Sequence, residues 1–136
     1  MRARSPVPVA AGEQVATIWE FERFIAAGCV DVIQPDLSRC GGVSVATRVA
    51  DLATRHGIDL VPHSWLTHLL TGYSLQLIAT LPRARFVEFN VSQSALTRGI
   101  ARASFDLAAD GTVPIPDTPG IGAEVDPDFI KAHRVN

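Results

Sequence analysis

Residues 31–63, with the sequence DVIQPDLSRCGGVSVATRVADLATRHGIDLVPH, decide the fold. Residues 31–34 predict a short strand, and apolar residues at helical spacing predict an amphipathic helix over 43–56. Gly57 is a typical residue to end that helix, and 58–61 predicts a further strand. Short strands that alternate with single helices pair in parallel through right-handed crossovers. The segment therefore predicts an α/β fold with a parallel sheet.

The same alternation extends to both sides of this segment. Before it, 7–11 predicts a strand and 15–27 a helix; after it, 69–81 predicts a helix and 85–90 a fourth strand. We therefore expect about four parallel strands that alternate with helices within residues 1–102.

Residues 103–136 break this pattern and are expected to form an irregular C-terminal tail. A helix is expected over 94–103, where the tail begins. Asp110-Gly111 lies between two short apolar runs, 105–107 and 113–115, and this arrangement is typical of a hairpin turn. The tail is not expected to form another strand-helix unit.

Composition excludes several classes of function. Of the 136 residues, 47% are hydrophobic and 19% are charged, which suits one folded domain rather than a disordered chain. The formal net charge is −2 without a block of one sign, so we expect neither nucleic acid nor a membrane surface as a partner. Cys29 and Cys40 lack the spacing of a zinc site and are typical of ordinary thiols in a cytoplasmic protein.

The beginning of the chain suggests that upstream sequence is missing. The strand predicted at 7–11 has the character of a buried strand, yet almost nothing precedes it. No run has the length of a signal peptide, and no segment approaches the ~20 apolar residues of a membrane span. We therefore expect a truncated chain or gene fragment of a soluble protein.

Four polar residues stand at or just past the ends of the predicted strands. They are Glu13, Asp36, His63 and Glu88, separated by 23, 27 and 25 residues. Each interval is the length of one strand, one helix and their loops, so each residue occupies the same point of a repeating unit. In a parallel α/β barrel that point is the C-terminal rim, where catalytic and ligand-binding groups gather. We therefore expect the four side chains to converge.

Each of these residues also has a purely structural explanation. Glu13 could favour a helix N-terminus, Asp36 could cap a loop, and His63 could be a hydrogen-bonded histidine of the core. Glu88 is harder to explain in this way, because a carboxylate in an apolar strand is costly without a partner or ligand. The other three histidines lie outside this register and are expected to be surface or helix residues.

Five short motifs follow one another along the chain: 11–13 (AGE), 31–42 (DVIQPDLSRCGG), 61–64 (VPHS), 87–89 (VEF) and 116–122 (PDTPGIG). In this order they resemble the mandelate racemase/muconate lactonizing enzyme family of the enolase superfamily, and its acid-sugar dehydratases in particular. The resemblance covers nearly the whole chain. It implies that the fold is the C-terminal half of a TIM-type (β/α)7β barrel, whose tail returns toward a capping domain.

Carried over position by position, the resemblance implies a role for each strand-end residue. Glu13, ending the fifth barrel strand, would be the third ligand of Mg²⁺. Asp36 and His63, ending the sixth and seventh strands, would form the family's His-Asp dyad. Glu88, on the eighth strand, would hydrogen-bond the carboxylate of the substrate or its enolate. The implied reaction removes the proton alpha to the carboxylate of a sugar acid and eliminates water to give a 2-keto-3-deoxy acid.

These residue types suit that chemistry. The enediolate formed by proton removal must be stabilised by a metal ion and by hydrogen-bond donors, and a protonated Glu88 could be such a donor. An imidazole titrates near neutrality, so His63 can move a proton while Asp36 fixes its tautomer and raises its basicity. Mg²⁺ prefers a nearly octahedral set of oxygens, of which Glu13 supplies one.

The resemblance also identifies parts of the family's site that precede this sequence. They are the other two Mg²⁺ ligands, a lysine-bearing strand and the capping domain, so we expect the isolated chain to be inactive. Four strands leave two open edges, and we expect self-association as a homo-oligomer, aggregation, or dependence on a missing half. A racemase, epimerase or cycloisomerase of the same family, and a non-catalytic half-barrel interaction unit, stay open as alternatives. A flavodoxin-like open sheet is disfavoured, because the carboxylate of Glu13 would repel a bound phosphate.

Overall fold

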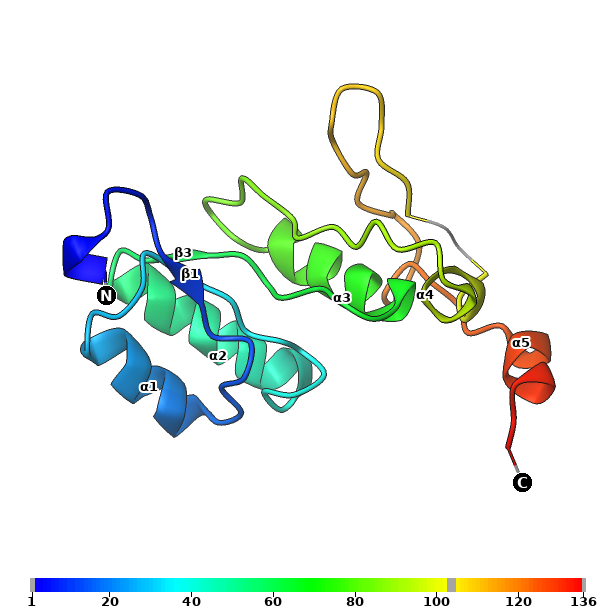
Figure 1. The fold of residues 1–136 in the computed structure, drawn as a ribbon, viewed down its shortest axis with the longest axis horizontal. Helices are drawn as coiled ribbons and strands as arrows, with labels where there is room; N and C mark the ends of the chain where they lie inside the picture. The colour runs from blue at the N-terminus through cyan, green and yellow to red at the C-terminus, as the bar shows by residue number, and fades with distance from the viewer. Residues whose placement is uncertain (1, 103–104, 136) are drawn as a thin grey trace.

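The computed structural model describes residues 2–102 and 105–135 (Figure 1). Its sheet consists of three parallel strands in chain order, β1 (Ala10–Ala11), β2 (Val32–Ile33) and β3 (Asp59–Leu60). A short 3₁₀ turn, η1 (Arg2–Arg4), precedes them. Because consecutive strands are neighbours and run the same way, the predicted α/β class and the parallel pairing are confirmed.

The strands are shorter than the sequence predicts, and proline explains why. The N–H groups of Val61 and His63 donate to the carbonyls of Ile33 and Pro35, both at 3.1 Å, so pairing of β2 with β3 continues beyond the strands. Pro35, however, has no N–H with which to return a hydrogen bond. The ladder is therefore incomplete at the point where the strand would otherwise lengthen.

The fourth strand expected over 85–90 is not observed, and this prediction was wrong for the described part of the chain. Since Val61 and His63 donate toward β2, the alternate position, Pro62, faces the opposite edge of β3. Pro62 has no N–H to offer a strand on that edge. Residues 85–90 instead follow the sheet as an extended segment without a ladder, in which Arg85 contacts Asp59 of β3 at 2.8 Å.

Three helices follow the three strands, as predicted: α1 (Ile18–Ala26) and α2 (Gly42–Arg55) fill the crossovers, and α3 (His68–Ala79) comes after β3. α1 begins with a capping box, in which Thr17 Oγ1 accepts from the N–H of Glu20 at 3.3 Å and the Glu20 carboxylate accepts from the N–H of Thr17 at 2.9 Å. This box fixes the start of α1 later than the sequence pattern alone suggests.

The core lies between the sheet and its covering helices. Figure 1 shows α1 and α2 side by side on one side of the sheet, with α3 further along the molecule. Phe21 of α1, Ile33 of β2 and Val49 of α2 are fully buried there. The helices thus hold the strands together from one face, which leaves the strand ends and their loops available to carry polar groups.

The tail contains two short helices, α4 (Ala95–Gly99) and α5 (Pro127–Ala132). α4 is shorter than the helix expected over 94–103, whose residue 103 lies outside the described residues. α5 was not predicted, although Asp126 accepts from the N–H groups of the first turn and a proline opens the helix.

The expected hairpin around Asp110-Gly111 is only a turn. The N–H of Gly111 donates to Ala108 at 2.9 Å and the N–H of Ala108 to Thr112 at 2.8 Å, but no strands flank this turn in the described residues. Pro114 follows closely and lacks the N–H that a ladder needs. The prediction of a hairpin was therefore wrong.

Part of the tail lies beside α3 and α4, while α5 lies at the far end of the molecule (Figure 1). Gln76 Nε2 of α3 donates to the carbonyl of Pro116 at 3.1 Å, and Ala101 pairs with Val125 in an isolated antiparallel bridge. No helix within 2–102 or 105–135 is long and apolar enough to cross a membrane.

Candidate active site

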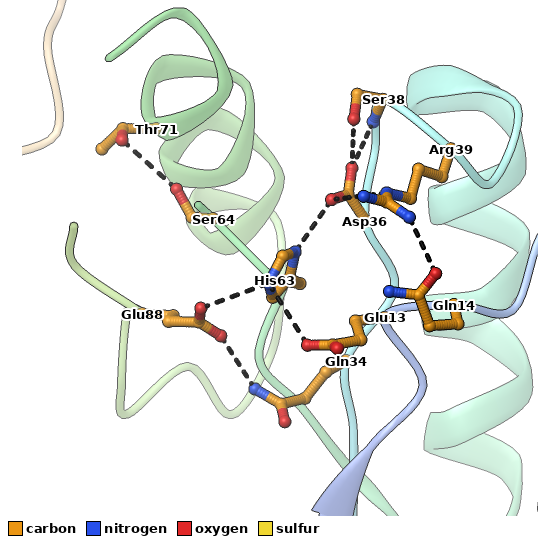
Figure 2. Close-up of polar contacts among 10 residues, drawn as sticks. All are labelled: Glu13, Gln14, Gln34, Asp36, Ser38, Arg39, His63, Ser64, Thr71 and Glu88. Carbon is orange, nitrogen blue, oxygen red and sulfur yellow. Dashed lines mark hydrogen bonds and ion pairs between the residues drawn. The ribbon is translucent and has the colours of Figure 1, made fainter. Parts of the chain in front are cut away.

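The four residues predicted from strand-end spacing lie together in the structure (Figure 2). Glu13 follows β1, and Asp36 and His63 pair as an isolated parallel bridge beyond the ends of β2 and β3. Glu88 reaches the same place from the extended segment that lacks a ladder. The parallel register of the strands therefore produces the convergence that the sequence spacing predicts.

A histidine-carboxylate pair forms the centre of the site. His63 Nδ1 lies 2.8 Å from Asp36 Oδ2, and the side chains are 15% and 1% exposed respectively. A carboxylate only accepts hydrogen bonds, so Nδ1 is the donor in this pair. The second ring nitrogen, Nε2, is thereby left free to accept or to deliver a proton.

Nε2 of His63 faces the two glutamates. It lies 3.3 Å from Glu13 Oε2 and 3.6 Å from Glu88 Oε1, and the glutamate side chains are 51% and 29% exposed. The site thus has a buried side at Asp36 and an accessible side at the two glutamates. A ligand would reach His63 from the accessible side, where its Nε2 is presented.

Asp36 is held as a carboxylate by its surroundings. Its Oδ1 accepts from the N–H of Ser38 at 2.8 Å and from the Ser38 hydroxyl at 2.5 Å, while Arg39 Nε lies 3.7 Å from Oδ2. Burial raises the pKa of Asp36, but the hydrogen bonds from Ser38 and His63 outweigh it and hold this pKa below its usual value. Asp36 is therefore ionised at neutral pH and can stabilise a positive charge on His63.

Gln34 is a site residue that the sequence reasoning missed. Its Nε2 donates to Glu88 Oε2 at 3.1 Å, which leaves Oε1 directed at His63 (Figure 2). Because the segment around Glu88 has no ladder, this side-chain contact helps to place the glutamate. A signal was present, since Gln34 is a polar residue at the end of the predicted strand 31–34.

The loop after His63 is tied to neighbouring elements. Ser64, which is fully buried, donates to Thr71 Oγ1 of α3 at 3.2 Å. Leu66 has a positive φ of 69°, and its carbonyl accepts from Thr97 Oγ1 at 2.8 Å and from Asn90 Nδ2 at 3.4 Å. A non-glycine residue in this conformation is strained and persists only when its surroundings fix it. Asn90 thus joins the loop of His63 to the segment of Glu88.

Among the predicted residues, Glu13 has the right chemistry to bind a divalent cation. Its carboxylate is half exposed at the rim, and carboxylate oxygen is the donor type that Mg²⁺ takes. Within the described residues, no group of three or more His, Cys, Asp or Glu side chains is arranged to hold a metal ion. The oxygen chemistry of Glu13 therefore suits a divalent cation, whereas its role as a ligand stays a prediction.

The fold and the site define a class: a parallel α/β protein with polar residues at the carboxyl ends of its strands. The model of the enolase C-terminal domain-like family matches residues 1–129. The chain belongs to this family, and within the enolase superfamily it is a member of the mandelate racemase/muconate lactonizing enzyme family. The resemblance found in the sequence is therefore confirmed.

Several relatives are enzymes that act on sugar acids or their lactones. The chain is 35% identical to D-galactarolactone cycloisomerase of Agrobacterium fabrum, over 99% of this chain and 38% of the relative. It is 31% identical to D-xylonate dehydratase of Haloferax volcanii, over 94% of this chain and 31% of the relative. The chain thus spans about a third of the length of these relatives.

A solved structure agrees with the fold. The 3,6-anhydro-D-galactonate cycloisomerase of Zobellia galactanivorans is 30% identical, with a TM-score of 0.89 over 97% of this chain and 37% of that one. The described chain therefore matches the C-terminal half of an enolase-superfamily barrel, as expected from the sequence.

Proposed function

We propose that this chain carries the acid-base side of the active site of a Mg²⁺-dependent acid-sugar dehydratase. The observation that supports this most is the dyad, in which Asp36 binds Nδ1 of His63 and leaves Nε2 facing two accessible carboxyl groups. The D-xylonate and D-galactonate dehydratases among the relatives support a sugar acid as the substrate.

In the proposed reaction, His63 acts at the carbon alpha to the substrate carboxylate. Its Nε2 takes the alpha proton, and the electron pair of the broken C–H bond moves into the carboxylate as an enediolate. Asp36 stabilises the imidazolium that results. The enediolate then expels the beta hydroxyl, which leaves as water with a proton from His63, and the enol product tautomerises to a 2-keto-3-deoxy acid.

The two glutamates stabilise and position the substrate. A protonated Glu88 would donate a hydrogen bond through Oε1 to the developing oxyanion, since Gln34 already donates to Oε2. Glu13 would be one oxygen ligand of Mg²⁺, which when bound supplies Lewis-acid stabilisation of the negative charge.

We further propose that residues 1–136 supply only part of the site. The other Mg²⁺ ligands and a capping domain would come from the remaining two thirds of a protein of the relatives' length, with residues 103–136 packing toward that domain. The isolated chain would then show no turnover. The complete protein would act in the cytoplasm and would bind neither nucleic acid nor membrane. A homo-oligomer through the open strand edges is the expected state of the chain alone.

A second candidate is a cycloisomerase of the same family. The 35% identical relative and the Zobellia galactanivorans structure both have that activity in their names. The same proton abstraction would then be followed by internal rearrangement rather than by loss of water. Racemisation or epimerisation would instead return the proton, and a non-catalytic half-barrel unit would show none of these reactions.

The test is a joined protein in which residues 1–136 replace the matching C-terminal part of the Agrobacterium fabrum relative. We expect it to convert a sugar acid to a 2-keto acid with Mg²⁺ and to lose activity with a chelator. A rearranged lactone or an epimer as the product would favour the alternatives. The isolated chain is assayed in parallel, and turnover by it would overturn the proposal that its site is incomplete.

A further inference from the structure

Ser38 contacts the carboxylate of the dyad. It lies in the loop between β2 and α2, two residues after Asp36, and was not identified by strand-end spacing. Its N–H and its hydroxyl both donate to Asp36 Oδ1, at 2.8 and 2.5 Å (Figure 2). Asp36 Oδ2 is the oxygen that binds His63 Nδ1 at 2.8 Å.

The hydroxyl of Ser38 is not needed to close its own loop. The N–H groups of Arg39 and Cys40 donate to the backbone carbonyl of Asp36 at 3.0 and 2.8 Å, and these bonds already form the turn. The Ser38 N–H adds one further bond within the turn. The hydroxyl acts only on the carboxylate, so its effect falls on the dyad rather than on the backbone.

A carboxylate held at one oxygen by a single donor can rotate about its side-chain torsion, which is broad for aspartate. Two donors on Oδ1 fix the plane of the Asp36 carboxylate and leave only Oδ2 for His63. Asp36 is 1% exposed while Ser38 is exposed, so the hydroxyl of Ser38 covers the outer side of a buried carboxylate, and its loss removes a fixed donor from Oδ1. The charged group Arg39 also faces Oδ2, at 3.7 Å, but it is half exposed and more weakly placed.

We propose that Ser38 is a positioning residue of the dyad: its hydroxyl fixes Asp36 Oδ1 so that Oδ2 holds His63 Nδ1. This inference rests on the proposed function, because it gives Ser38 a role only through the acid-base pair. Ser38 orients the carboxylate that orients the imidazole, and it does not itself contact the substrate.

The test uses the 136-residue chain and nuclear magnetic resonance, so it does not depend on turnover. In the wild-type chain we expect a separate, slowly exchanging resonance for the Nδ1 proton of His63. In Ser38→Ala the exchange of this proton should be at least about tenfold faster, the change expected when one hydrogen bond to a charged group is lost. The pKa of Asp36, followed by its carboxyl ¹³C shift, should rise, because a bond that lowers it is removed.

Ser38→Thr is the rescue variant, because threonine keeps the hydroxyl, and it should restore both signals. Ser44→Ala is the matched control, since Ser44 is exposed on α2. Unchanged proton exchange and an unchanged Asp36 pKa in Ser38→Ala would overturn the proposal. If Ser38→Ala does not fold, Ser38→Thr still decides: the Nδ1 proton of His63 should exchange as slowly as in the wild-type chain, and faster exchange would overturn the role.

The outcome separates this inference from the proposed function. If the joined protein has no activity but the His63 signals depend on Ser38, the dyad is positioned as proposed and the reaction is assigned wrongly. If the joined protein is active and the His63 signals do not change in Ser38→Ala, the proposed reaction is supported and the positioning role of Ser38 is wrong.

Discussion

Gly12→Ala tests whether the backbone before Glu13 must pack closely against β2. Gly12 has a φ of +132°, and a Cβ there would lie 2.9 Å from Ile33 Cδ1 and 3.2 Å from the backbone nitrogen of Gln34. An L-residue with positive φ costs about 1–2 kcal/mol. Overpacking against β2 adds about 1–3 kcal/mol, so we expect the free energy of unfolding to fall by about 2–5 kcal/mol in total.

Gly57→Ala is the matched control for this variant. Gly57 also has a positive φ, of +66°, but no atom lies within 4 Å of its added Cβ, so only the backbone term of about 1–2 kcal/mol applies. Urea denaturation followed by circular dichroism measures both variants, and the slope with denaturant should stay unchanged. If Gly12→Ala is within about 0.5 kcal/mol of Gly57→Ala, the close contact with β2 is not a constraint and the reasoning is refuted.

Three further predictions concern the stability of the chain. The free energy of unfolding should fall as the pH drops from 7.5 through ~6.5. Burial and the charge of Arg98 lower the pKa of His68 in the folded state, so the unfolded state takes up the proton first. His68→Gln should flatten this dependence between pH 7.5 and 5.5, and an unaltered dependence would show that another group is responsible. Phe21→Ala should lower the free energy of unfolding by about 3–5 kcal/mol in urea denaturation, because Phe21 is fully buried. Trp19→Ala, at a residue 69% exposed on the same helix, should change that free energy little, and equal losses in the two variants would contradict the described core. Thr17→Ala should cost about 1 kcal/mol by removing the capping box of α1, measured by the thermal midpoint, and the prediction fails if the midpoint is unchanged.

The order of elements and the convergence of the site were predictable because both follow from regular spacing along the sequence. Apolar residues at helical spacing predicted α1 and α2, and a more continuously apolar run ended by a proline predicted α3. Parallel strands bring equivalent positions to one rim. The site geometry was therefore predictable from the similar intervals between Glu13, Asp36, His63 and Glu88. Their roles in catalysis come from family resemblance and stay predictions.

Other features could not be predicted because they depend on contacts across the fold. The expected fourth strand does not form a ladder with β3, because Pro62 has no N–H to donate. This matters only at the edge of β3 that Pro62 faces, and the sequence does not give that edge. His68 was expected at the surface or on a helix; it begins α3 but is fully buried, where its Nδ1 accepts from the N–H of Phe105 at 3.3 Å. Gln34 and Ser38 become site residues only through partners that the chain fold supplies.

Exchange of the substrate alpha proton in the joined protein, with and without His63→Asn, decides whether His63 moves that proton. A sugar acid that the joined protein accepts is incubated in D₂O with Mg²⁺, and deuterium at the alpha carbon and 2-keto acid are both followed. We expect His63→Asn to abolish both signals while the free energy of unfolding stays near that of the parent, since asparagine fits the space of the imidazole. Exchange and product formation at the parent's rate would contradict the assignment of His63 and Asp36 as the acid-base dyad.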